Sequence, residues 1–128
     1  MADPLEHVDD KLTRLIIGAA IEVHRHLGPG LTEPAYERAL TIELTRIGTS
    51  FVRQLSVPVL FRGHVVGTYR ADLVVENRVV VEIKSVEKLV GVHQAQLLAY
   101  MRVLRMPTGL LLNFYGEVLR TGVRRLSI

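Results

Sequence analysis

Asp72, Glu82 and Lys84 lie within two valine-rich runs that a short polar segment centred on Asn77 separates. The valine-rich runs around them are typical of buried β-strands, where charged side chains are rare unless they are paired or bind a metal. Asp72 and Glu82 are equally distant from Asn77, so a three-residue turn centred on Asn77 sets them opposite each other in a β-hairpin. Like charges that face each other across two strands repel, and a bound cation is the simplest compensation.

Side chains alternate between the two faces of a strand, so Glu82 and Lys84 share one face while Val81 and Ile83 take the other. Hydrolysis of a phosphodiester needs a metal that neutralises charge and activates a water, and magnesium prefers oxygen ligands. The candidate ligands are Asp72, Glu82 and the backbone carbonyl of Ile83, with Lys84 stabilising charge in the transition state. An ordinary ion pair on a solvated face explains this common pattern equally well.

Two polar residues follow on a predicted helix. Gln96 and Tyr100 are four residues apart and therefore lie on one helix face, with His93 three residues before Gln96. This spacing places them where they can act on a phosphate or on an attacking water. Taken alone, the pattern fits a boundary helix with polar groups facing solvent better.

A third element is the segment from Gly30 to Tyr36, which contains Glu33 at the start of a predicted helix. An acidic residue there is stabilised by the exposed N–H groups of the first turn, so capping is the favoured local explanation. The functional alternative is a further carboxylate that reaches the metal site.

The length of 128 residues fits one domain over residues 1–128, and we expect residues 1–8 to be flexible. The chain contains no cysteine, which excludes disulfides and thiolate chemistry. No apolar run is long enough to span a membrane, and the N-terminus lacks the basic and apolar regions of a signal peptide. We therefore expect a cytoplasmic protein without a membrane partner.

Charge is unevenly distributed along the chain. Residues 1–50 carry eight acidic and five basic residues, whereas residues 89–128 carry five arginines and one acidic residue, Glu117. A basic region of this kind could lie along a phosphate backbone, but a solvated surface is the slightly favoured explanation on charge alone.

The periodicity of apolar residues predicts helices and strands in the order α-α-β-β-β-α-β-β, which is typical of a mixed sheet flanked by helices. Pro58 indicates an edge strand or a bulge. The apolar run from Gly109 to Phe114 fits a central strand as well as a dimer surface, so a homodimer stays open. The expected helices cover about 9–27, 32–47 and 90–105, and the expected strands cover 51–61, 64–75, 79–85, 109–115 and 118–126.

These residues resemble the GxxExxY protein family, a branch of the PD-(D/E)XK nuclease-like superfamily. The resemblance extends over roughly residues 9–126, and Ala71 departs from it by replacing the nominal proline before the aspartate. The matching positions are Gly30, Glu33 and Tyr36 for the motif that names the family, Asp72 with Glu82-Ile83-Lys84 for the metal-binding core, and Gln96 with Tyr100 for a QxxxY element.

The resemblance implies a restriction-endonuclease-like α/β/α sandwich around a small mixed sheet, with magnesium or manganese as cofactor. It implies a metal site made by Asp72, Glu82 and Ile83, with Glu33 in the acidic position of the first helices. Lys84 is then expected to activate water or stabilise the transition state, and Gln96 and Tyr100 to support the site.

Two functions follow. The first is a metal-dependent nuclease that hydrolyses DNA or RNA through an activated water. The alternative is a non-catalytic module with a nuclease fold that binds nucleic acid or a protein partner, because the catalytic core occupies nearly all of these residues and leaves no evident recognition domain.

Overall fold

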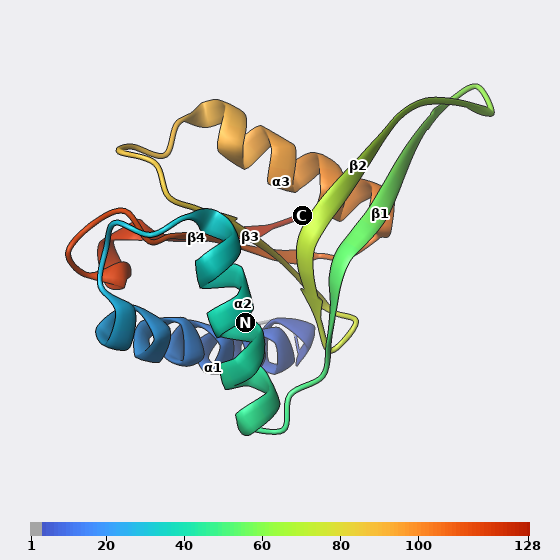
Figure 1. Cartoon of the computed structure of the whole chain (residues 1–128). Helices are drawn as coiled ribbons and strands as arrows, with labels where there is room; N and C mark the ends of the chain where they lie inside the picture. Colours follow the sequence, from blue (N-terminus) through green and yellow to red (C-terminus); the bar gives the residue numbers. More distant parts are fainter. Residues whose placement is uncertain (1–3) are drawn as a thin grey trace.

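The computed structural model describes the backbone of residues 4–128 and the side chains of residues 10–128 (Figure 1). Within this part of the chain, three α-helices, one short 3-10 helix and five strands follow one another in the expected order. The elements are α1 (Pro4–Leu27), α2 (Glu33–Arg46), β1 (Phe51–Phe61), β2 (His64–Val75), β3 (Val79–Lys84), α3 (Gly91–Leu104), β4 (Thr108–Asn113), η1 (Leu119–Gly122) and β5 (Val123–Ser127).

The five strands form one mixed sheet in the order β1-β2-β3-β4-β5. Neighbouring strands are antiparallel except β3 and β4, which are parallel. Parallel strands need a crossover connection, and α3 supplies it. All six residues of β4 are buried, so the apolar run that also fitted a dimer surface is a central strand.

Helices α1 and α2 cover one face of the sheet and α3 covers the other, as Figure 1 shows. The core under α1 and α2 includes Ile16, Leu40, Val81 and Ile83, and the core under α3 is built around Leu97 and other buried residues. Gly109 of β4 permits this second contact, because a Cβ there would lie 2.6 Å from the sulfur of Met101. The predicted α/β/α sandwich is confirmed.

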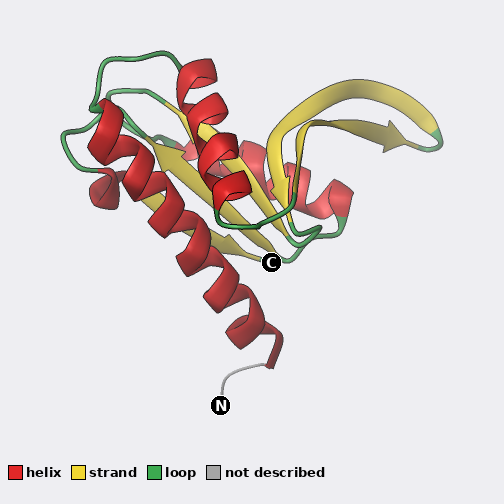
Figure 2. Cartoon of the chain, turned by 60° about the horizontal axis from the view of Figure 1, so that its bottom comes forward, coloured by secondary structure: helices red, strands yellow, loops and turns green. Residues whose placement is uncertain are grey.

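The β1–β2 hairpin extends past the helices and curves away from the rest of the sheet (Figure 2). Its tip is a two-residue turn in which Arg62 and Gly63 both have positive φ angles, of 49° and 80°. This conformation matches the twist of antiparallel strands. As Pro58 predicts, β1 is an edge strand, and its pairing with β2 shifts register between Val59 and Leu60.

Two sequence expectations differ from the structure. Helix α1 begins at Pro4 and not near residue 9, since proline is tolerated in a first turn; of the segment expected to be flexible, residues 1–3 lie outside the described part. The expected strand over 118–126 was wrong in its first half, which forms η1. The 3-10 turn buries Leu119 to 2% exposure, a packing gain that the strand-like alternation of the sequence did not reveal.

Candidate active site

Asp72 and Glu82 meet where β2 and β3 separate. The pairs Val75–Val79, Val74–Val80 and Leu73–Val81 confirm the three-residue turn, and the next residues along are Asp72 and Glu82. There the main-chain pairing is replaced by side chains. The Asp72 N–H donates to Glu82 Oε1 at 3.1 Å, and the N–H of Ile83 donates to Asp72 Oδ2 at 2.8 Å. The two carboxyl groups are therefore fixed next to each other.

Burial makes this pair electrostatically costly. Glu82 is only 3% exposed, and burial, followed by the negative charge of Asp72, raises its pKa to about 8. Burial also raises the pKa of Asp72, although the hydrogen bond from the Ile83 N–H opposes this. A hydrogen bond between the two carboxyl groups favours the protonated form of Glu82 and the ionised form of Asp72. Two adjacent carboxyl groups resist ionising together because their negative charges repel. A bound cation removes this repulsion, so the pair is suited to binding one.

Lys84 and Tyr100 of α3 lie close enough to the carboxylate pair to interact with it electrostatically. The Lys84 ammonium is 3.4 Å from the Oε1 atom of Gln96, a long hydrogen bond. Tyr100 is 5% exposed, and its pKa is raised by burial and then by the charges of Glu82 and Asp72. The phenol is thus protonated and within electrostatic reach of both carboxyl groups. The predicted residues Glu82, Lys84, Gln96 and Tyr100 come together here.

His93 does not join this group. Its Nδ1 atom accepts the N–H of Val90 at 3.0 Å, so the imidazole caps the first turn of α3. His93 is the third residue of α3, where a side-chain acceptor can satisfy a free N–H at the helix start.

Glu33 approaches from the first turn of α2. Its Oε2 atom accepts the N–H of Ser85 at 2.9 Å, directly after Lys84. This bond is made to the segment after β3 and not to the first turn of α2, where the capping explanation would place it. The residue before Glu33, Thr32, forms no side-chain cap. Glu33 and Asp72 line the same cleft of about 380 Å³, whose other lining residues are Pro34, Glu37, Arg53 and Gln54.

Tyr36 of the same motif has a structural position. Its ring stacks on Phe114 with centroids 4.4 Å apart. Its hydroxyl donates to the Gly28 carbonyl at 2.6 Å and accepts the Leu31 N–H at 3.1 Å. Tyr36 therefore holds the turn that precedes Glu33.

Three residues at the cleft were not predicted from the sequence. Glu37 is one turn after Glu33 and is 5% exposed; its carboxylate accepts from Arg53 at 2.8 Å and from Gln54 at 2.7 Å. Gln54 also reaches Asp72 Oδ1 at 3.4 Å. The spacing of four from Glu33 was a usable signal for Glu37, because such residues share a helix face.

Asn113 was also missed. Its side chain accepts the Val86 N–H at 3.0 Å and donates to the Val86 carbonyl at 2.8 Å. It lies at the end of β4, beside Lys84 of β3. The amide thus holds the chain that leaves β3 just after the lysine, and a polar residue closing an apolar strand was the available signal.

Among side chains of residues 10–128, no three histidine, cysteine, aspartate or glutamate groups lie close enough together to hold a metal ion. Asp72 and Glu82 form a pair, and Glu33 stays bonded to Ser85. A pair is still an adequate protein contribution for magnesium, which usually keeps several waters and is bound through one or two carboxylates.

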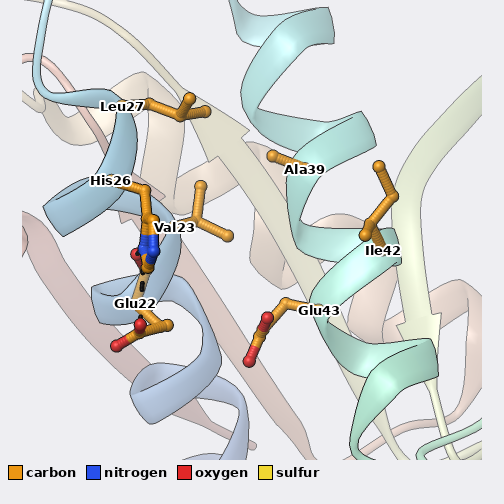
Figure 3. A pocket seen from close by; sticks show the side chains of 7 residues that line it. All are labelled: Glu22, Val23, His26, Leu27, Ala39, Ile42 and Glu43. Atoms are coloured by element: carbon orange, nitrogen blue, oxygen red, sulfur yellow. Dashed lines mark hydrogen bonds and ion pairs between the residues drawn. The ribbon is translucent and has the colours of Figure 1, made fainter.

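A separate groove lies between α1 and α2, and Figure 3 shows the side chains that line it. It is lined by Glu22, Val23, His26, Leu27, Ala39, Ile42 and Glu43. None of these is a predicted site residue, and Glu22 and Glu43 are engaged with basic neighbours on their own helices. The groove therefore adds nothing to the carboxylate pair.

Within the part of the chain that the structure describes, no helix is both long and apolar enough to cross a membrane. The family model of the PD-(D/E)XK nuclease superfamily matches residues 10–126 of the chain. No curated protein and no solved structure matches the chain significantly. The match names the superfamily; the narrower resemblance to GxxExxY proteins stays a prediction. Because the matched region covers almost the whole chain and contains the carboxylate pair, this protein belongs to the PD-(D/E)XK nuclease superfamily.

Proposed function

We propose that the protein is a metal-dependent nuclease that hydrolyses phosphodiester bonds of nucleic acid with a water as nucleophile. The observation that carries this proposal is the contact between the half-buried Asp72 and the buried Glu82, two carboxyl groups whose pKa values are raised. Nucleases of this superfamily typically use divalent metals. Perturbed carboxyl groups at a cleft are typical of functional sites, where burial and like charge are tolerated for the sake of chemistry.

The donor groups fit a hard divalent cation such as magnesium or manganese. Asp72 and Glu82 offer carboxylate oxygens whose remaining lone pairs are not used by the N–H groups that hold them. The carbonyl of Ile83 is the third protein ligand in this proposal, and Glu33 is a further acidic group that lines the same cleft as Asp72. A divalent cation bound there would neutralise phosphate charge and increase the acidity of a water.

Lys84 supplies positive charge beside the pair. We assign it to the phosphate oxygens, where an ammonium stabilises the negative charge that grows as the attacking oxygen bonds to phosphorus. Gln96 holds the ammonium through its side-chain oxygen at 3.4 Å. The protonated hydroxyl of Tyr100 is available as a hydrogen-bond donor on the same side of the sheet.

The charge distribution supports nucleic acid as the substrate. Residues 51–71, which make up most of the β1–β2 hairpin, contain three arginines and no acidic residue. Arg62 at the tip and Arg70 near the base are exposed. Residues 89–128 add five arginines against one acidic residue. Arg53 is paired with Glu37, whereas exposed arginines such as Arg62 and Arg70 attract a phosphate backbone in a salt-dependent manner.

A cleavage screen tests this function. The purified protein is incubated with Mg²⁺ or Mn²⁺ and single-stranded, duplex and branched DNA and with RNA, beside Lys84→Ala and Asp72→Asn. We expect metal-dependent cleavage of at least one substrate by the wild type and strong loss in both variants at unchanged thermal stability. Intact substrates under all conditions, with the wild type folded, would contradict the nuclease proposal.

One observation favours the alternative of a binding module without catalysis. The carboxylates of Glu33 and Asp72 already accept main-chain N–H groups, as structural carboxylates do. Salt-sensitive binding of nucleic acid without cleavage, and without Asp72-dependent binding of Mn²⁺, would support this second function.

A further inference from the structure

Gln54 has a strained backbone in the middle of β1. Its φ angle is 49°, in the left-handed region that non-glycine residues rarely adopt. The other non-glycine residues with positive φ in the described part of the chain are at turns or at a helix end, where this conformation is common; they are Arg62, Glu76, Asn77 and Arg105. Strain of this kind persists where the surrounding structure enforces it, often at functional sites.

The strain coincides with a break in the sheet beside Asp72. Arg53 pairs with Leu73 and Leu55 pairs with Ala71, but the intervening Gln54 and Asp72 are not paired. Ala71 packs in the core under α3, whereas Leu73 packs in the core under α1 and α2. Residues two apart in a regular strand face the same side. The alternation of β2 is therefore interrupted at Asp72, opposite Gln54.

The break turns the Gln54 amide toward two carboxylates. Its Nε2 atom donates to Glu37 Oε1 at 2.7 Å and lies 3.4 Å from Asp72 Oδ1. Glu37 is itself fixed, because it is 5% exposed and its other oxygen accepts from Arg53 at 2.8 Å. A primary amide has two N–H groups and no charge, so it can join two carboxylates without adding to their repulsion.

We propose that Gln54, anchored by Glu37, is a positioning residue that fixes the orientation of the Asp72 carboxylate for metal binding. Ile83 N–H holds Asp72 Oδ2 at 2.8 Å, and Gln54 holds Oδ1 from the opposite strand. The carboxylate is thus restrained at both oxygens, and rotation about its side-chain bonds is limited. This inference rests on the proposed role of Asp72 as a metal ligand.

The backbone strain allows a sharp test. Gln54→Gly removes the amide but adopts a positive φ angle without cost. Gln54→Asn keeps an amide and tolerates the left-handed region, but it is one methylene too short to reach both partners. Arg105→Gly is the matched control, because Arg105 has a φ angle of 56° at the end of α3 and is not among the residues that line the cleft.

The measurements are calorimetric titration of each full-length protein with Mn²⁺ and thermal unfolding without metal. We expect Mn²⁺ to bind at least about tenfold more weakly to both Gln54 variants. Losses of this size are typical when a hydrogen bond that orients a metal ligand is lost. We expect their Tm values to stay within about 4 °C of the wild type, because relief of strain offsets the lost hydrogen bond to Glu37 and, in the glycine variant, the greater freedom of the unfolded chain. Arg105→Gly is expected to leave Mn²⁺ affinity unchanged.

Three results would overturn the positioning role: wild-type affinity in the Gln54 variants, an equal loss in Arg105→Gly, or a loss accompanied by a large fall in Tm. Asp72→Asn separates this failure from failure of the proposed function. If the wild type binds Mn²⁺ through Asp72 and the Gln54 variants bind it equally well, only the positioning role is lost. If the wild type shows no Asp72-dependent binding, both proposals are wrong.

Discussion

Asp72 of β2 and Glu82 of β3 are joined by a hydrogen bond in which the Asp72 main-chain N–H donates to Glu82 Oε1 at 3.1 Å. The neighbouring N–H of Ile83 donates to Asp72 Oδ2 at 2.8 Å. Each carboxylate therefore takes a place that a main-chain carbonyl would fill in a continuous ladder. The pair is held in position before any ligand arrives, so little ordering is needed when a cation binds.

Metal binding is predicted to depend on pH through Glu82. Its carboxyl group must lose a proton to bind a cation, and its pKa is raised to about 8 by burial and by Asp72. Below that pH, affinity for Mn²⁺ should fall by about tenfold per pH unit, and binding should release a proton. Titrations in two buffers of different ionisation enthalpy measure the proton release. In Glu82→Gln, residual binding should lack this steep dependence; an identical pH profile would contradict the role of Glu82.

The stability of the metal-free protein is predicted to decrease as pH rises. In the folded state Glu82 keeps its proton up to about pH 8, whereas the ordinary pKa of a glutamate, which applies to the unfolded chain, is 4.5. Between these two pH values the folded state therefore binds more protons than the unfolded state. The contribution of protonated Glu82 to the free energy of unfolding is fully present below pH 4.5 and is lost as pH approaches 8. Its size is on the order of 3–5 kcal/mol. Urea unfolding at several pH values checks the sign, with Glu82→Gln as the variant that should show a flatter curve.

Lys84→Ala is predicted to remove cleavage while leaving metal binding in place. The ammonium next to Gln96 stabilises charge in the transition state and is not a metal ligand, so the cleavage rate should fall by about a hundredfold or more. Lys88→Ala is the matched control, because Lys88 is an exposed lysine four residues further along. Equal rates for Lys84→Ala and the wild type in a single-turnover assay would exclude this role.

Tyr36→Phe is predicted to destabilise the protein by about 1–3 kcal/mol, because the Gly28 carbonyl and the Leu31 N–H lose their buried partner. Chemical denaturation measures the change. Tyr115→Phe is the control, since Tyr115 is 49% exposed and should tolerate the loss of its hydroxyl. If Tyr36→Phe is as stable as the wild type, the hydroxyl does not hold the turn before Glu33.

The carboxylate pair and its strands were predictable from the sequence for a simple physical reason. Symmetry about Asn77 sets the register of a hairpin, and alternation then fixes which residues share a face. The structure places Leu73 opposite Val81, in agreement with this register. Local patterns of this kind do not depend on the rest of the fold, and the same holds for the two-residue turn at Arg62 and Gly63.

Other features depend on contacts between distant segments and were not predictable in this way. The left-handed backbone of Gln54 has no signature in the residue itself, because glutamine has no preference for positive φ. It is associated with Glu37, 17 residues away, and with Asp72, 18 residues away. The sequence pattern of the short helix η1 is typical of a strand. The segment forms a helical turn because this conformation buries Leu119 in the core.

The most direct test of the central claim is a calorimetric titration of Mn²⁺ into the wild type, Asp72→Asn and Glu82→Gln at pH 8, with thermal unfolding to confirm that all three are folded. The account predicts one Mn²⁺ site in the wild type and at least a tenfold loss of affinity in each variant, because both carboxylates hold the same ion. Equal Mn²⁺ affinity in all three folded proteins would contradict it.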